Sequence, residues 1–272
     1  GASYTREYFD VPVPGYSMAD HFTGRGFTLV ALDHLGSGES SWPAAASPDL
    51  VAAANDRAVA VILATARQEV IPGGATVIGI GHSMGGQLVT RQQADHRTFA
   101  AIAVLGWSAT HTIIRAADGS LLTSVPDSER EPAIADAEVV TPERFRDLPP
   151  GYLYTRPRSA LARWAFYPDD LDPAVIAADE AAIGVVAPGV YAADGFSSPG
   201  FGLDSARRVD VPVLLAFGDR DTTPDAAAEP SFYPAAPEIT LVRLPGSSHC
   251  HNFAPSRVRL WDRLLAWGSS LT

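Results

Sequence analysis

Residues 81–86 read Gly81-His82-Ser83-Met84-Gly85-Gly86, a G-x-S-x-G pattern with one more glycine behind it. The apolar run Thr76–Ile80 comes directly before it, and a helical pattern over Gln87–His96 follows. A strand, a tight turn and a helix in this order put the central serine at a sheet edge, at the positive end of a helix dipole. Bulky side chains do not fit beside such a turn. The pattern therefore predicts Ser83 as a nucleophile and the backbone N–H of Met84 as an oxyanion donor.

A serine nucleophile needs a general base, and two histidines of one loop are candidates. His249 follows the apolar run Ile239–Val242 and precedes the last predicted helix, Pro255–Trp267. A loop at the carboxyl end of a strand can reach the nucleophile, so we expect His249 to be the base. His251, two residues further on, is the alternative.

The orienting acid is expected in the turn after the apolar run Val213–Phe217. Asp221 lies within that turn, whereas Asp219 is close to the strand end and is expected to structure the turn. The residues after another apolar run, Ala100–Leu105, include no acid. We therefore expect Asp221 to orient the base, with Asp219 as the alternative.

Short apolar runs alternate with helical patterns along the chain, which predicts an α/β fold with a mostly parallel sheet and helices on both faces. Ser47, Pro48 and Asp49 form a typical helix start. The runs expected to be buried strands are Phe27–Leu32, Thr76–Ile80, Ala100–Leu105, Val213–Phe217 and Ile239–Val242.

One long region, 108–208, interrupts this alternation. It shows no clear strand and contains two helical patterns, Arg158–Tyr167 and Pro173–Ile183. A segment of this length is too long for a plain loop, so we expect a helical lid, with residues 1–107 and 209–272 as the α/β core. Aromatic side chains are frequent in and beside the insert. The candidate substrate-binding residues are Trp107, Trp164, Tyr167 and, within the Ser83 motif, His82.

Four short motifs follow one another along the chain in an order that is found in a known protein family. These are the turn Asp33-His34-Leu35-Gly36-Ser37-Gly38-Glu39-Ser40, the motif around Ser83, the turn Gly218–Asp221 and the loop Pro245–His249. Together they resemble the α/β-hydrolase superfamily. The resemblance implies that superfamily's fold and a Ser–Asp–His triad, but no substrate. It implies a structural role for Asp33, which we expect to accept hydrogen bonds from turn N–H groups.

The beginning of the chain departs from this pattern. In the superfamily, three strands and a histidine-glycine loop that gives the second oxyanion donor usually precede the Asp33 turn, whereas only 26 residues precede Phe27 here. We therefore expect the native protein to carry further residues before Gly1, which supply up to three strands and half of the oxyanion hole. A front segment that was cleaved but stays bound, and a second donor within Tyr4–Tyr16, are the alternatives.

Composition excludes several other functions. A formal net charge of −11 repels nucleic acid, and no apolar run approaches the roughly 20 residues of a membrane helix. The sequence contains no metal-binding or cofactor-binding motif, so we expect no cofactor and no metal. The single cysteine, Cys250, favours a cytoplasmic protein, with a disulfide-free secreted enzyme as the alternative. Oligomeric state is left open.

The predicted activity is cleavage of a small or medium apolar carboxylic ester through an acyl-enzyme. Thioesters, lactones, C–C bonds and acyl transfer can all use the same triad, so these activities remain alternatives. A binding protein that kept the hydrolase fold is the alternative from another class.

Overall fold

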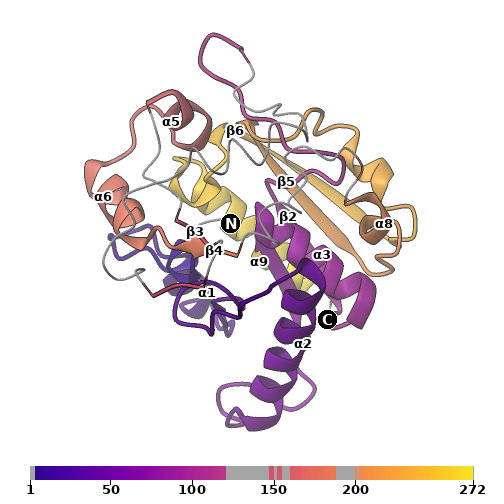
Figure 1. Ribbon diagram of the computed structural model, residues 1–272. Coiled ribbons are helices and arrows are strands. Elements are labelled where there is room, and N and C mark those ends of the chain that lie inside the picture. The colour runs from indigo at the N-terminus through magenta and orange to yellow at the C-terminus, as the bar shows by residue number, and fades with distance from the viewer. Residues whose placement is uncertain are drawn as a thin grey trace.

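A parallel sheet lies at the centre of the computed structural model, which describes residues 4–120, 147–149, 152–154, 160–187, 200 and 202–271 (Figure 1). In spatial order its strands are β1 (Ile78–His82), β2 (Ala101–Leu105), β5 (Val213–Arg220) and β6 (Ile239–Ser248). Each pair of neighbours is parallel. The predicted α/β class is confirmed, and the carboxyl ends of the four strands lie at one edge of the sheet.

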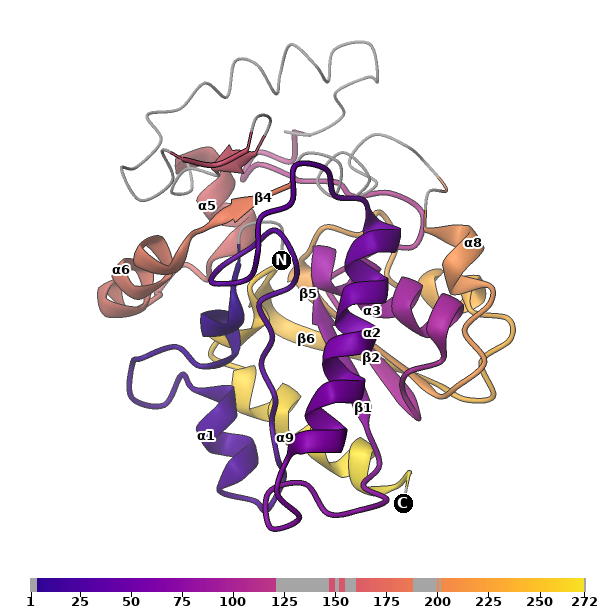
Figure 2. The same cartoon turned by 60° about the horizontal axis from the view of Figure 1, so that its bottom comes forward.

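Helices cover both faces of the sheet (Figure 2). On one face lie α1 (Met18–Thr23) and α9 (Arg257–Ser269). On the other lie α3 (Met84–His96) and α8 (Leu203–Ala206), and α2 (Pro48–Thr65) packs against α3. The described short 3-10 helices are η1 (Arg6–Phe9), η3 (Glu229–Phe232) and η4 (His251–Phe253). No described helix is both long and apolar enough to cross a membrane.

The predicted start of α2 is confirmed in detail. The Ser47 hydroxyl accepts a hydrogen bond from the Leu50 N–H at 3.2 Å, and Pro48 is the first helical residue. Proline suits this position because the N–H that it lacks has no partner in the first turn of a helix.

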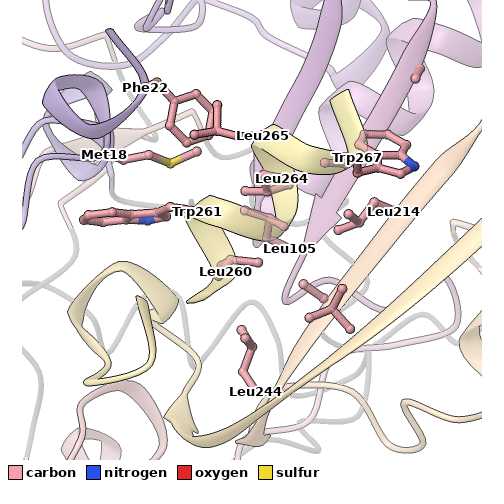
Figure 3. Close-up of a cluster of buried hydrophobic side chains, with 14 residues drawn as sticks. Met18, Phe22, Leu105, Leu214, Leu244, Leu260, Trp261, Leu264, Leu265 and Trp267 are labelled. Carbon is pink, nitrogen blue, oxygen red and sulfur yellow. The ribbon is translucent and has the colours of Figure 1, made fainter. Parts of the chain in front are cut away.

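Apolar side chains of α9 pack against α1 and the sheet (Figure 3). Trp261 and Leu264 are buried in a cluster with residues of α1 and three of the strands. The Trp261 indole N–H also donates to the side-chain oxygen of Asn252 at 2.8 Å, and the Asn252 amide donates to the Tyr8 carbonyl at 2.9 Å. Burial of one such large side chain stabilises a fold by about 1.5–3 kcal/mol, so the loop before α9 is firmly anchored.

The prediction of a strand over Phe27–Leu32 is wrong. The segment is extended but pairs with no described strand, and Val30 and Leu32 are 48% and 37% exposed. A cavity of about 470 Å³, lined by this segment and by β1, lies between them. An apolar run forms a sheet strand only where another backbone lies alongside, and no described backbone does so here.

The described part of the predicted insert contains α5 (Ala160–Phe166) and α6 (Pro173–Ala182), close to the two predicted helices. It also contains an antiparallel pair, β3 (Leu153–Tyr154) and β4 (Val185–Val186), although the sequence showed no clear strand there. Much of region 108–208 lies outside the described residues, and its role as a lid stays a prediction.

Candidate active site

Ser83 occupies a sharp turn between β1 and α3. Its φ is 55° and its ψ is −126°, and its N–H donates to the Leu105 carbonyl of β2 at 2.8 Å. Such a conformation costs a residue other than glycine about 1–3 kcal/mol and persists only where the surrounding structure enforces it. The turn brings strand and helix so close that a Cβ at Gly81 would lie 2.0 Å from the Gly85 carbonyl oxygen. Glycine at position 81 is therefore a steric requirement of this turn.

Met84 begins α3 immediately after Ser83, which is where the predicted oxyanion donor belongs. Within the described ranges, its backbone N–H has no protein acceptor. An N–H at the first position of a helix carries part of the positive end of the helix dipole. Ser83 is partly exposed, whereas Met84 is buried. Residues 1–3 lie outside the described residues.

Asp221 and His249 form a buried pair at the carboxyl edge of the sheet. Asp221 directly follows β5 and His249 directly follows β6. The His249 Nδ1 atom lies 2.7 Å from Asp221 Oδ1, and the two side chains are 2% and 1% exposed. A carboxylate only accepts hydrogen bonds, so Nδ1 carries the proton and Nε2 is the nitrogen with basic character.

Gly106 places this pair beside the end of β1. It follows Leu105, whose carbonyl binds the Ser83 N–H, and its φ is 62°. A Cβ at Gly106 would lie 3.0 Å from His249 Nδ1 and 3.1 Å from Asp221 Oδ1. Glycine here lets the acid and base approach the strand end that is hydrogen-bonded to the serine turn.

A second imidazole binds the same carboxylate. His251 Nε2 lies 2.7 Å from Asp221 Oδ2, and the His251 side chain is fully buried. The backbone N–H groups of Gly218 and Thr222 donate to Oδ2 and Oδ1, each at 2.8 Å. Asp221 thus accepts four hydrogen bonds.

These contacts decide the ionisation of Asp221. Burial alone would raise the pKa of its carboxyl, but interactions with His251 and His249 outweigh burial and hold the pKa well below its usual range. The site therefore contains a permanent buried negative charge beside two imidazoles.

His82 lies behind the serine turn and holds the histidine loop. Its Nε2–H donates to the His249 carbonyl at 2.8 Å, and its ring stacks on Tyr8 at 4.3 Å between centroids. Burial, and then the proximity of His249, lowers the pKa of His82, which keeps the ring neutral.

The turn around Asp221 is held from both sides. The Asp219 carboxylate accepts the Gly246 N–H at 2.7 Å, which is the structural role expected for Asp219. Arg220 donates to Asp169 at 2.8 Å and to the Tyr167 carbonyl at 3.2 Å, and its guanidinium lies 5.0 Å from the centre of the Trp164 ring.

The end of α5 also contacts the base directly. The backbone N–H groups of His249 and Cys250 donate to the carbonyls of Ala165 and Phe166 at 2.9 and 3.1 Å. The Phe166 ring meets the His249 ring edge to face at 5.1 Å. The described insert therefore reaches the carboxyl edge of the sheet and supports the loop that carries His249.

The predicted substrate-binding aromatics are engaged with protein groups. Trp107 is buried in the cluster on the α3 face, and the Tyr167 hydroxyl donates to the buried carboxylate of Asp179. Trp164 is half-buried against Arg220. Substrate contact by these residues or by His82 stays a prediction.

The Asp33 turn is structural, as expected. Asp33 accepts the Glu39 N–H at 3.1 Å, and a Cβ at Gly38 would lie 2.3 Å from the Asp33 carboxyl. Asp33 also pairs with the Arg6 guanidinium at 2.7 Å. Among the described residues, no cluster of His, Cys, Asp and Glu is arranged to hold a metal ion.

Sequence reasoning missed three features of the site: the close approach at Gly106, the bond of His251 to the acid and the support from α5. The position of Gly106 directly after a predicted strand was the only local signal. The other two depend on contacts between segments far apart in the sequence.

Comparison with known proteins identifies the family. A model of the alpha/beta hydrolase family matches residues 1–259. A search of curated proteins finds no match.

Solved structures share the fold at low identity. An esterase from Thermogutta terrifontis has a TM-score of 0.64 and 16% identity, with 100% of this chain and 88% of that chain covered. A monoacylglycerol lipase from Paleococcus ferrophilus has a TM-score of 0.62 and 16% identity, with 100% and 91% covered. The esterase RhEst1 from Rhodococcus has a TM-score of 0.57 and 19% identity, with 100% and 89% covered.

Proposed function

The chain belongs to the alpha/beta hydrolase family, and we propose that it cleaves small or medium apolar carboxylic esters with Ser83, His249 and Asp221. The observation that carries the proposal is the buried pair of His249 and Asp221, 2.7 Å apart, at the sheet edge that also bears the strained Ser83 turn. A buried imidazole bound to a carboxylate through one nitrogen is arranged to accept a proton at the other.

In the proposed reaction, the Ser83 hydroxyl attacks the ester carbonyl while His249 Nε2 takes its proton. The Met84 N–H stabilises the oxyanion of the tetrahedral intermediate, and Asp221 stabilises the imidazolium. His249 then gives the proton to the leaving alcohol. Water, activated by the same nitrogen, attacks the acyl-enzyme, releases the acid and restores Ser83.

The orientations of the two imidazoles support His249 as the base. His249 faces Asp221 with Nδ1, so Nε2 points away from the acid. His251 faces Asp221 with Nε2, and its Nδ1 is buried without a partner among the described residues.

The proposed substrate class has two supports. The similar solved structures include esterases and a monoacylglycerol lipase. The half-buried Trp164 and the Phe166 ring on His249 bring aromatic surface to the carboxyl edge of the sheet, where an apolar group would be favoured.

The test combines a fluorophosphonate label with a series of p-nitrophenyl esters of increasing acyl length. We expect Ser83 to be labelled, and Ser83→Ala to lower kcat by about 10⁴–10⁶. Ser231→Ala, at an exposed serine of η3, is the matched control and should retain the activity of the wild type.

His249→Ala should be as damaging as Ser83→Ala, and activity should fall below about pH 6–7 because the free base must be unprotonated. An unlabelled Ser83, or a Ser83→Ala variant that keeps more than a few per cent of activity, would refute the proposal. A thioester or lactone cleaved in preference to every p-nitrophenyl ester would change the substrate class but not the triad.

A further inference from the structure

The carboxylate of Asp221 is shared by two imidazoles, but a Ser–His–Asp triad needs only one. His249 Nδ1 and His251 Nε2 lie 2.7 Å from Oδ1 and Oδ2, and all three side chains are almost completely buried. The second imidazole therefore occupies the oxygen that the proposed base leaves open.

The protonation of His251 follows from its contacts. Its Nε2 faces an oxygen that only accepts, so Nε2 carries a proton. Its Nδ1 is buried and has no partner in the described part of the chain. A second N–H there would be a buried donor without an acceptor, which is more costly than a bare lone pair. His251 therefore directs its Nε2–H at Asp221, and its Nδ1 meets no acceptor among the described residues.

Several titratable groups lie around His251. The His82 and His249 rings lie 5.6 and 6.5 Å away, and a charge on His251 would oppose a charge on either. Tyr8, stacked on His82, and Cys250, the preceding residue, are the other titratable groups nearby. Asp221 provides the negative charge in this group, and the hydrogen bond from His251 Nε2–H stabilises that charge.

We infer that His251 is a positioning residue, which donates its Nε2–H to Asp221 and fixes the plane of the carboxylate toward His249. This inference rests on the proposed function. With Oδ2 held by His251 and by the Gly218 N–H, rotation of the carboxyl away from Nδ1 would break two hydrogen bonds. The hydrogen bond from His251 also delocalises part of the negative charge of Asp221. A less negative carboxylate stabilises the protonated form of His249 less strongly.

The test compares His251→Gln with His251→Leu in the ester assay. Glutamine places an amide nitrogen at the same number of bonds from the backbone as the histidine Nε2, so it keeps the donor but cannot titrate. Leucine removes the donor. We expect His251→Gln to stay within about threefold of the wild-type kcat, and His251→Leu to lose roughly tenfold because the acid and base are misaligned.

The pH profile separates positioning from packing. In His251→Leu, the more negative carboxylate should move the acid limb of kcat/KM upward by about half a pH unit or more, whereas His251→Gln should keep the wild-type limb. A wild-type rate and profile for His251→Leu would overturn the inference. So would a His251→Gln variant as inactive as His249→Ala, because that result would assign proton transfer to His251.

A proton NMR spectrum makes the test independent of whether the leucine variant folds. Imidazole N–H protons bound to a buried carboxylate resonate downfield of the amide region. The wild type should show two such signals and His251→Gln one, and a single signal in the wild type would overturn the inference. If Ser83→Ala is inactive while both His251 variants keep the wild-type kcat and pH profile, the proposed function stands and only this inference is refuted.

Discussion

Two histidines, the buried His82 and the partly buried His34, make the stability of this protein depend on pH. Burial lowers the pKa of His34 to about 4, and it is also the main cause of the lowered pKa of His82. A histidine in an unfolded chain titrates near 6.5. Between these values the unfolded chain binds protons that the folded protein does not, so the free energy of unfolding falls as the pH drops below about 6.5.

We therefore expect the melting temperature to fall steadily from pH 7 to pH 4.5, and to fall less in His34→Gln. The depressed pKa of Asp221 acts in a different range, because its stabilisation is complete above about pH 4 and is lost only in stronger acid. His96→Gln, at an exposed histidine in the last turn of α3, is the matched control. Equal pH slopes for the wild type and His34→Gln, measured by thermal denaturation, would contradict the prediction.

At the scale of single residues, local signals predicted most of the candidate site and tertiary contacts decided the rest. The G-x-S-x-G pattern between a strand and a helix was enough to indicate the Ser83 turn. The sequence could not separate His249 from His251 in the same way, because both belong to one short loop. Their difference lies in which ring nitrogen faces Asp221, and that depends on where β5 places the acid beside the loop after β6.

Among the elements, α5 has the most direct influence on the loop that carries His249. Its last carbonyls accept the N–H groups of His249 and Cys250, and Arg220 links β5 to Asp169 and the Tyr167 carbonyl just beyond the helix. Asp169 is 76% exposed, so its ion pair with Arg220 contributes little to stability. The contact of Arg220 with Asp169 and the Tyr167 carbonyl therefore acts mainly by fixing the position of α5.

We expect Arg220→Gln to lower kcat/KM for esters by roughly three- to tenfold, because small displacements of catalytic groups have large effects on rate. The melting temperature should fall by no more than about 4 °C. Arg97→Gln, which removes an exposed arginine paired with Asp210 at 3.4 Å, is the control and should change neither quantity. An Arg220→Gln variant that loses stability while its kcat/KM is unchanged would show that the contact only stabilises the fold.

Element boundaries show where sequence patterns stop being informative. The apolar run Ile239–Val242 predicted the first part of β6, but the strand continues to Ser248 because β5 offers it a partner as far as Arg220. Phe27–Leu32 has a similar apolar pattern and forms no strand, because no described backbone lies within pairing distance. In both cases the outcome depends on the neighbouring chain and not on the run itself.

Across the whole molecule, the candidate catalytic residues come from segments spread over more than half of the chain. The strands that precede them, β1, β5 and β6, are parallel and end at one edge of the sheet. The order of the motifs predicted this arrangement. The expectation of further strands before Gly1 is not tested by the described residues and stays a prediction.

A cavity lies along the outer side of β1. The cavity of about 470 Å³ between β1 and residues 26–32 is also lined by Val59 and Ile62 of α2 and by Leu264 and Trp267 of α9. Apolar side chains of two helices therefore line this cavity, together with those of β1 and of residues 26–32. Open apolar surface of this kind binds hydrophobic dyes, so we expect this 272-residue chain to enhance the fluorescence of anilinonaphthalene sulfonate in its native state.

A matched pair of substitutions on α2 locates the bound dye. Val59→Trp adds a large ring on the cavity side of the helix and should reduce the dye signal, because it occupies the space that the dye would enter. Val61→Trp adds the same ring at a position that is 60% exposed and should leave the signal unchanged. Equal signals in the two variants would place the dye elsewhere, and a wild-type signal no greater than that of a well-packed protein would mean that the space beside β1 is closed in solution. The expected difference between the variants arises only if the cavity is open and apolar, since both carry the same added surface on one helix.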